Sequence, residues 1–215
     1  MPPTFQDLKA KLGDWLAVDI GRLADSVRGD CINLAMRDLA RLHDLWLNEV
    51  GGSGTNLLLS VGVRDYGVPS DFSRPHSIWY QSLTDLSIIV FVTQRSKEQF
   101  DALFPDDAKT GLPAFYTFWA GKLQFGPTPE ATFAGHINYY AVPEDLTDAL
   151  NTNLFTQFAW EAVFFRALVY ASKYLIEDPR LPVWEQGARD AELKLVIENA
   201  RARHSGGPLV IEEPG

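Results

Sequence analysis

The four histidines are the first side chains whose chemistry could define a site in this 215-residue chain: His43, His76, His136 and His204. None of them has a second metal-binding side chain three or four residues further on, the spacing that places two ligands on one face of a helix. A structural or catalytic zinc ion needs three or four converging ligands. The sequence therefore predicts no metal site.

Three adjacent carboxylate pairs could in principle supply an acid and a base: Asp106-Asp107, Glu144-Asp145 and Glu212-Glu213. Neighbouring side chains point apart on any regular element, so such a pair does not present two acids to one glycosidic bond. The glycine-rich segment 51–55 lacks the Gly-Lys-Ser/Thr ending of a phosphate loop and follows a predicted helix. We expect it to end that helix or to form a flexible hairpin.

The remaining nucleophiles give no catalytic pattern either. Cys31 is the single cysteine and adjoins Ile32 near the apolar side of a predicted helix, where a thiol usually fills space. It cannot form an internal disulfide, so nothing indicates a secreted, bridge-stabilised fold. The chain also has no Gly-x-Ser-x-Gly motif. We therefore predict no catalytic residue, no cofactor and no enzymatic activity.

Composition narrows the class of protein. Hydrophobic residues make up 46% of the chain, which excludes a disordered or low-complexity protein. The net charge of -9 argues against a general nucleic-acid binder, which needs clustered lysine and arginine. The N-terminus lacks a signal segment, and the longest apolar run, 88–92, is far shorter than the roughly 20 residues that span a bilayer. We expect a soluble intracellular product with no membrane contact.

The first elements that must carry these residues are helices. Thr4 and Asp7 form a capping-box pattern for a helix over about 5–16, whose apolar residues recur at three- and four-residue spacing. A longer helix follows over about 25–49. The last third predicts two more helices, over about 154–176 and 181–203, and the former is apolar on several faces. An extended tail, 205–215, follows them.

The middle of the chain changes to the alternating pattern of β-strands. We predict strands at about 57–63, 78–80 and 86–92, and Pro69 and Pro75 bracket a loop. Ser96 and Gln99 open a short helix that ends by Pro105. A hairpin with Ala120-Gly121 as its turn and a strand over 132–141 complete this part.

These elements predict an α+β fold that is mainly helical. The N- and C-terminal helix pairs would form a four-helix bundle, and residues of about 55–141 would form a small antiparallel β-sheet insertion. No internal repeat or long linker separates two domains. We therefore expect a single domain over residues 1–204, followed by the tail.

Several phrases, in their order and spacing, resemble the head-to-tail adaptor family of tailed bacteriophages. They extend over nearly the whole chain, from about Thr4 to Arg203. The phrases are Leu8-Lys9-x-x-Leu12-x-x-Trp15-Leu16, Val68-Pro69-Ser70-Asp71-Phe72, Gly121-Lys122-Leu123-Gln124-Phe125-Gly126-Pro127-Thr128-Pro129, Asn138-Tyr139-Tyr140-Ala141-Val142-Pro143 and Glu177-Asp178-Pro179-Arg180-Leu181-Pro182. The segment 84–94 departs from the pattern by being more apolar, which leaves the sheet arrangement open.

The resemblance implies a structural virion protein at the head-tail junction, made in the host cytoplasm. It implies a homo-oligomeric ring of roughly twelve copies that binds the portal protein, extends the DNA channel and offers a platform for the tail or nozzle. DNA would pass through the lumen without sequence-specific binding, and the acidic balance suits such a lumen. Two alternatives stay open: a tail-completion or tail-tube terminator ring protein, and a virion-associated cell-wall hydrolase, which would need a general acid in a cleft.

Candidate contact residues for these partners lie near the chain's C-terminus and in its glycine-rich segment. Leu209, Val210 and Ile211 form an apolar extended stretch that could add a strand to the portal or to a neighbouring subunit. Arg201 and Arg203 could make charge-complementary contacts, or simply favour the end of their helix as cations. We also expect the segment 51–55, with Gly52 and Ser53, to form a mobile tip facing the next ring.

Overall fold

The computed structural model describes residues 1–17, 21–51, 57–82, 89–176 and 178–203. The chain forms two compact units, which are considered separately. The helical unit consists of Met1–Asn48 and Val142–Gly215, and the sheet unit consists of Glu49–Ala141. Each unit has its own hydrophobic core. Among the described residues, no helix has the length and apolar character needed to cross a membrane.

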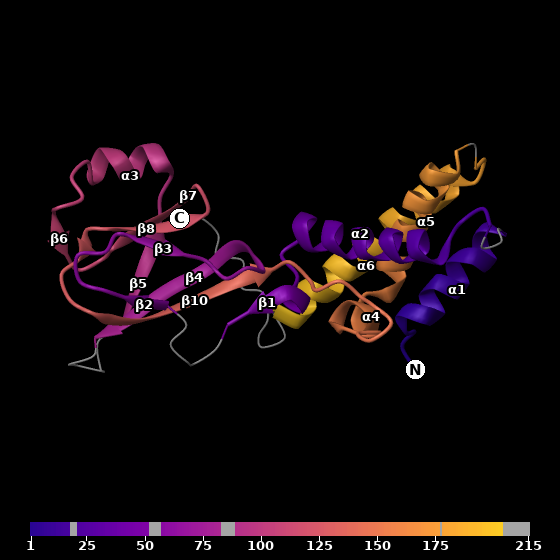
Figure 1. Cartoon of the computed structure of the whole chain (residues 1–215), viewed down its shortest axis with the longest axis horizontal. Helices are drawn as coiled ribbons and strands as arrows, with labels where there is room; N and C mark the ends of the chain where they lie inside the picture. The colour runs from indigo at the N-terminus through magenta and orange to yellow at the C-terminus, as the bar shows by residue number, and fades with distance from the viewer. Residues whose placement is uncertain (18–20, 52–56, 83–88, 177, 204–215) are drawn as a thin grey trace, which may run out of the picture. The chain divides into compact units, whose positions relative to one another are not determined.

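Five α-helices and one short 3-10 helix form the described part of the helical unit (Figure 1). They are α1 (Phe5–Leu16), α2 (Asp25–Leu42), η1 (Trp46–Asn48), α4 (Leu154–Phe158), α5 (Trp160–Leu175) and α6 (Leu181–Arg203). The predicted capping box starts α1, since the Thr4 hydroxyl accepts from the Asp7 amide and the Asp7 carboxylate accepts from the Thr4 amide. α2 ends seven residues earlier than the predicted helix, because His43 takes an extended conformation with φ −129°.

α5 is the central helix of this unit and packs against α1, α2, α4 and α6. Its core residues include Val163, Ala167 and Leu168, all fully buried. Neighbours within the same unit therefore cover most of the apolar surface that the sequence assigns to this helix. The exposed apolar residues lie instead before α5 and at its far end: Leu154, Phe158, Tyr174 and Ile176.

The predicted helix over 154–176 is two helices in the structure. Asn153 caps α4 through a capping box with Thr156. At Ala159 the backbone leaves the helical region, with φ −128° and ψ 18°, and α5 starts at the next residue. Neither glycine nor proline marks this corner, so the sequence carries no local signal for it.

The sheet unit contains an eight-stranded sheet with the order β1-β10-β4-β5-β7-β8-β3, and β2 also pairs with β10. A two-stranded sheet, β6-β9, and the helix α3 accompany it (Figure 1). The bounds are β1 (Glu49–Val50), β2 (Leu57–Leu59), β3 (Asp65–Gly67), β4 (Phe72–Ser82), β5 (Ile89–Gln94), α3 (Lys97–Leu103), β6 (Thr110–Gly111), β7 (Phe115–Trp119), β8 (Lys122–Gly126), β9 (Thr128–Pro129) and β10 (Phe133–Ala141).

The sheet curls into a half-barrel around its own core. β2 and β3 follow each other in the chain but pair with opposite ends of the strand order, through β10 and β8. The connection between them is fixed by Tyr66, whose hydroxyl accepts from the Ser60 amide at 2.8 Å. The Ala120-Gly121 turn joins β7 and β8 as predicted, and both residues have positive φ, as a tight hairpin turn requires.

The prediction of a four-helix bundle with a small antiparallel sheet is wrong. The described helical unit has five α-helices, and the sheet is large and mixed. The sheet is large because β5 pairs with β7, which joins the strands β1, β10, β4 and β5 to the strands β7, β8 and β3. β5 and β7 are parallel, and the connection between them contains α3. Pairing between distant segments of this kind leaves no periodic signal in either segment.

The predicted loop between Pro69 and Pro75 is largely strand. β4 starts at Phe72 and runs through Pro75, where its register with β10 shifts. A proline is tolerated at such an irregularity because it has no amide hydrogen to offer the ladder. On the other edge of β4, β5 pairs only with Ile78–Gln81, so Pro75 does not have to donate a hydrogen bond to β5.

Candidate functional site

The residues that the sequence singles out for partner binding are only partly described. Arg201 and Arg203 lie exposed in the last turn of α6, a position that favours cations. The other five lie outside the part of the chain that the structure describes: Gly52, Ser53, Leu209, Val210 and Ile211. The predicted tail and glycine-rich contacts therefore stay predictions.

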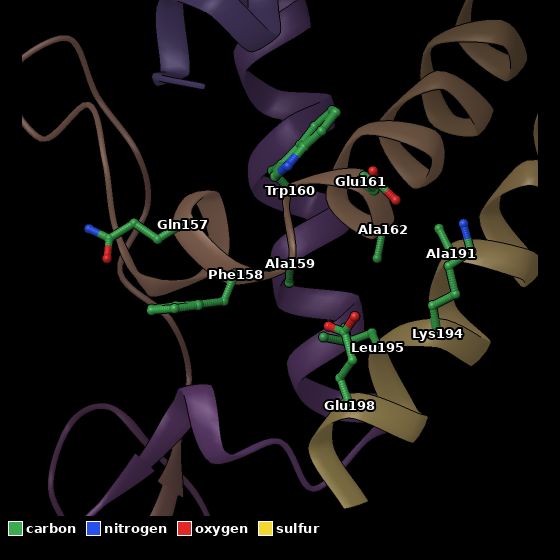
Figure 2. Close-up of a pocket in the computed structure, with 10 residues that line it drawn as sticks. All are labelled: Gln157, Phe158, Ala159, Trp160, Glu161, Ala162, Ala191, Lys194, Leu195 and Glu198. Carbon is green, nitrogen blue, oxygen red and sulfur yellow. The ribbon is translucent and has the colours of Figure 1, made fainter. Parts of the chain in front are cut away.

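A groove in the helical unit runs between the α4–α5 corner and α6 (Figure 2). Its volume is about 210 Å³. Four buried residues line it with small or branched apolar groups: Ala159, Ala162, Ala191 and Leu195. The lining is completed by Gln157, Phe158, Trp160, Glu161, Lys194 and Glu198. The groove thus has a small apolar base between aromatic and charged walls, and polar atoms make up most of its accessible lining.

Aromatic contacts hold the walls of this groove. The Phe158 ring is 54% exposed and meets the Trp46 ring edge-on, with centroids 5.2 Å apart. The Lys11 ammonium lies 4.9 Å from the centroid of the Trp160 ring. Asn199 of α6 accepts from the Trp46 amide and donates to the Asp44 carbonyl, both at 2.9 Å. These contacts keep α6 and the α4–α5 corner at a fixed spacing.

A second exposed feature lies at the other end of α5, where Tyr174 and Ile176 form an apolar tip. Their exposed fractions are 57% and 75%. Ile176 has φ 53° and ψ 130°, a conformation that branched side chains rarely adopt. Strain of this kind persists only where the surroundings hold it, and it is concentrated at functional sites.

Arg180 lines the same depression as Ile176 of the apolar tip. Its guanidinium makes a bidentate contact to the Asp178 carboxylate at 2.9 and 3.1 Å and donates to the carbonyls of Trp15 and Leu16. The latter are carbonyls at the end of α1, so Arg180 also caps that helix. Hydrogen bonds from Arg180 lower the pKa of Asp178 to about 2.

A polar network joins α2, α5 and α6 within the same unit. Arg166 of α5 donates to Glu192 of α6 at 3.1 Å and to Asp38 of α2 at 3.4 Å. Tyr170 also donates to Asp38, and His43 contacts Glu192 at 2.5 Å. Every carboxylate in this network already has partners from two residues. It is therefore a structural connection between helices rather than an acid poised for catalysis.

The sheet unit carries a partly exposed aromatic row on the face that points away from its core. The ring of Trp79, which is half-buried, is stacked 3.6 Å from that of His136, which is buried, and Phe91, next to Trp79 in register, is 70% exposed. Ile89 and Leu58 on the same face are 53% and 55% exposed. Exposed apolar side chains that share one face of a sheet are candidates for a protein contact.

Two of the described carboxylates that the sequence offered for chemistry make ion pairs within the fold, whereas Glu212, Glu213 and His204 lie outside the described residues. Asp107 pairs with Arg64, and Asp145 pairs with Arg37, so two of the three carboxylate pairs are tied by arginines. Burial raises the pKa of the Cys31 thiol to about 11, which removes its nucleophilic character at neutral pH. Within the described ranges, no three His, Cys, Asp or Glu side chains lie together as metal ligands would.

The sequence did not identify the groove or the apolar tip. Periodicity placed Leu154, Phe158, Tyr174 and Ile176 on one long buried helix, because it could not reveal the corner at Ala159 or the unusual backbone at Ile176. The one available signal was Asn153-x-x-Thr156, a capping-box pattern at the start of α4.

Comparison with protein families gives one match. Residues 3–211 fit the family model described as SU10 adaptor protein. The match spans both compact units, including the groove and the apolar tip of the helical unit and the aromatic row of the sheet unit. No curated protein matches the chain.

Proposed function

Because the chain belongs to the family of tailed-phage head-to-tail adaptor proteins, we propose that its copies form a ring below the portal. This ring extends the DNA channel and provides the platform to which the tail or nozzle attaches. The observation that carries the proposal is the family match over residues 3–211, which leaves neither unit outside the adaptor family. The partners are then further copies of the chain, the portal protein and a tail or nozzle protein.

Exposed apolar surface on both units supports a role in assembly. The helical unit has its groove and apolar tip, and the sheet unit has its aromatic row. Exposed aromatic and branched side chains of this kind mark protein contacts rather than a solvated surface. A connector needs several such surfaces, since it contacts neighbours within its ring as well as the structures above and below it.

The net charge of -9 supports the DNA channel part of the proposal. DNA must slide past the ring without adhering, and a protein that neutralises few phosphates has little non-specific affinity. An acidic surface repels the phosphate backbone as well. Sequence-specific contacts to DNA are not required by this role.

Cryo-electron microscopy of the tail vertex of the intact particle tests the proposal. We expect a closed ring of this chain, roughly twelve copies, between the portal and the tail or nozzle. A map that places the chain at the distal end of a tail tube would replace the adaptor with a tail-completion or terminator protein. Absence of the chain from the vertex would overturn both.

A peptidoglycan turbidity assay on the purified chain separates these structural roles from a virion-associated hydrolase. We expect no clearing above buffer, since the chain belongs to an adaptor family. Glu161 and Glu198, two carboxylates that line the groove, are the residues to test for a general acid. Clearing that disappears on Glu161→Gln or Glu198→Gln substitution would assign the groove to catalysis and would contradict the proposal.

A further inference from the structure

We propose that the corner at Ala159 is a switch: when the ring forms, α4 swings onto the end of α6 and joins α5 in one continuous helix over 154–175. The structure holds the corner bent, and Figure 2 shows the Phe158 ring pointing away from α6. This inference rests on the proposed function, because ring assembly supplies the trigger. It goes further by naming the part of the chain that changes on assembly.

The corner has no stop signal of its own. A helix usually ends at glycine or asparagine, or just before proline, whereas the residue that breaks this helix is alanine, the strongest helix former. Backbone hydrogen bonds continue on both sides of it, from the Ala159 amide to the Phe155 carbonyl at 2.9 Å and from the Val163 amide to the Ala159 carbonyl at 3.1 Å. Rotation of Ala159 to helical angles, about φ −63° and ψ −42°, would therefore make the helix continuous.

Ion pairs between α5 and α6 determine where a continued helix would lie. Two of them join the helices with the same register: Arg166–Glu192 and Lys173–Glu185. Seven residues forward on α5 thus correspond to seven residues back on α6. The same step in the other direction, from Arg166 and Glu192, places Ala159 opposite Asn199. A continued α5 would run along the last turns of α6.

α6 is long enough to receive α4. It has 23 residues and is about 34 Å long, whereas α5 has 16 residues and is about 24 Å long. In the register of the ion pairs, α5 begins opposite Glu198, so α6 extends past it. Glu198 and the residues 200–203 are exposed. Ala202 lies seven residues after the buried Leu195, on the same side of α6, and its small side chain permits close approach of a second helix.

The aromatic residues of α4 would face α6 in the continuous helix. Phe155 lies eleven residues, or about three helical turns, before Arg166, and Phe158 lies eleven residues before Val169. Arg166 and Val169 both line the space between α5 and α6. The Phe158 ring, which is 54% exposed in the bent form, would be covered there, and burial of apolar surface favours the continuous helix.

A set of contacts on the other side, here called the latch, holds the corner bent. Asn199 accepts from the Trp46 amide and donates to the Asp44 carbonyl, both at 2.9 Å. The Trp46 ring meets the Phe158 ring with centroids 5.2 Å apart, and Phe155 is buried in the core. Tertiary contacts and local preference therefore favour different forms at this corner. Such disagreement is expected at strained or functional positions.

Assembly can select the continuous form because the two forms present different surfaces. A partner shifts an equilibrium only through a difference in its affinity for the two states. Withdrawal of α4 uncovers the Trp46 ring, and tryptophan is among the residues that dominate protein interfaces. A ring contact that covers Trp46 would therefore bind the continuous form better than the bent one.

Double electron–electron resonance between two spin labels tests the switch. Labels at Leu154→Cys on α4 and Tyr174→Cys on α5 are 20 residues apart in the sequence, which corresponds to about 30 Å along a continuous helix. We expect a shorter distance in the purified chain and a lengthening to about 30 Å in phage particles. Both sites are exposed, whereas the native Cys31 is buried and its thiol has a pKa raised to about 11, which disfavours labelling.

The matched control carries its labels at Glu161→Cys and Tyr174→Cys, which both lie within α5. Their distance, about 20 Å along the helix, should be the same in the purified chain and in particles. An unchanged distance between the labels at 154 and 174 in particles that contain the chain would overturn the switch and leave the adaptor role standing. Absence of the chain from the vertex would instead overturn the proposed function itself.

Release of the latch gives an independent measurement on the purified chain. Asn199→Ala removes two hydrogen bonds that favour the bent form, so the fraction of chains with the longer distance between 154 and 174 should rise about tenfold. Arg201→Ala, at an exposed position on the same helix, is the control and should leave the distances unchanged. An Asn199→Ala variant without this rise, or an equal rise in Arg201→Ala, would overturn the inference.

Discussion

At the scale of single residues, the contact between Asp178 and Arg180 couples the α5–α6 junction to the end of α1. The Asp178 side chain is 5% exposed and accepts from Arg180, from the Arg180 amide and from Ser172. In the sequence, Asp178 and Pro179 fall between the two helices predicted over 154–176 and 181–203. The junction's role in closing α1 depends on carbonyls more than 160 residues away, and no local pattern reports them.

This contact predicts an acid-dependent loss of stability. Because Arg180 lowers the pKa of Asp178 from 3.8 to about 2, the folded state favours the carboxylate. Its contribution, about 2 kcal/mol for a shift of nearly two pKa units, is present in full above pH 3.8 and is lost as the pH falls toward 2. Asp178→Asn should lower the free energy of unfolding at pH 7 by roughly 1–3 kcal/mol, and urea titrations at pH 7 and pH 3 measure both effects.

The exposed Lys97–Asp101 pair serves as the control for that series. Its aspartate is 51% exposed, and exposed pairs of this kind contribute about 0.2–1 kcal/mol. Asp101→Asn should therefore change little at either pH. Equal effects of the two substitutions would mean that the Asp178–Arg180 contact does not hold the junction.

At the scale of elements, the closest approach in the sheet is that of β2 to β10. Gly135 pairs with Leu57 on one side and with Tyr80 on the other, and a Cβ at Gly135 would collide with the Leu57 carbonyl oxygen. A backbone atom cannot move aside as a side chain can. We expect Gly135→Ala to lower the free energy of unfolding by roughly 1–3 kcal/mol, measured by chemical denaturation.

Gly67 on β3 provides the matched control. It is also a strand glycine, but a Cβ there would meet nothing within 4 Å. Gly67→Ala should be neutral or slightly stabilising, because alanine restricts the unfolded chain more than glycine does. A comparable loss at both positions would show that strand glycine itself, and not the approach of β2, sets the effect.

The cap of α4 determines one wall of the groove. The Asn153 side chain accepts from the Thr156 amide at 3.1 Å, and the Thr156 hydroxyl accepts from the Asn153 amide at 3.0 Å. Asn153→Ala should cost about 1 kcal/mol of stability. The exposed Asn151, whose carbonyl alone accepts from the Phe5 amide, is the control site. An Asn151→Ala variant as unstable as Asn153→Ala would contradict the assigned cap.

Element by element, the sequence predicts what local chemistry decides. Periodicity and caps locate α1 and α6 with the observed bounds, and the Ala120-Gly121 turn locates the β7–β8 hairpin. It does not predict the corner at Ala159, the passage of β4 through Pro75 or the joining of the sheet through α3. Each of these is set by tertiary pairing, which overrides local preference. The corner at Ala159 forms part of the groove, so the sequence could not predict the groove either.

At the scale of the whole molecule, we predict that the protein has little affinity for DNA. The net charge of -9 gives phosphates little to bind. Non-specific DNA binding through lysine and arginine usually has a Kd of about 10⁻⁴ to 10⁻⁶ M at physiological salt. We therefore expect fluorescence anisotropy with a labelled duplex to show no binding at 0.1 mM protein and about 0.15 M salt.

Salt dependence decides how any binding that does occur is to be interpreted. A chain that releases few counterions should show a nearly flat response between about 50 and 200 mM salt, whereas 6–10 phosphate contacts would change the affinity about 10³- to 10⁵-fold over that range. Arg201→Ala with Arg203→Ala tests the α6 end directly, since these two exposed cations are the predicted contact residues on that helix. Micromolar binding that weakens steeply with salt and disappears in this double variant would make the end of α6 a DNA contact. The acidic balance of the chain would then no longer account for the passage of DNA.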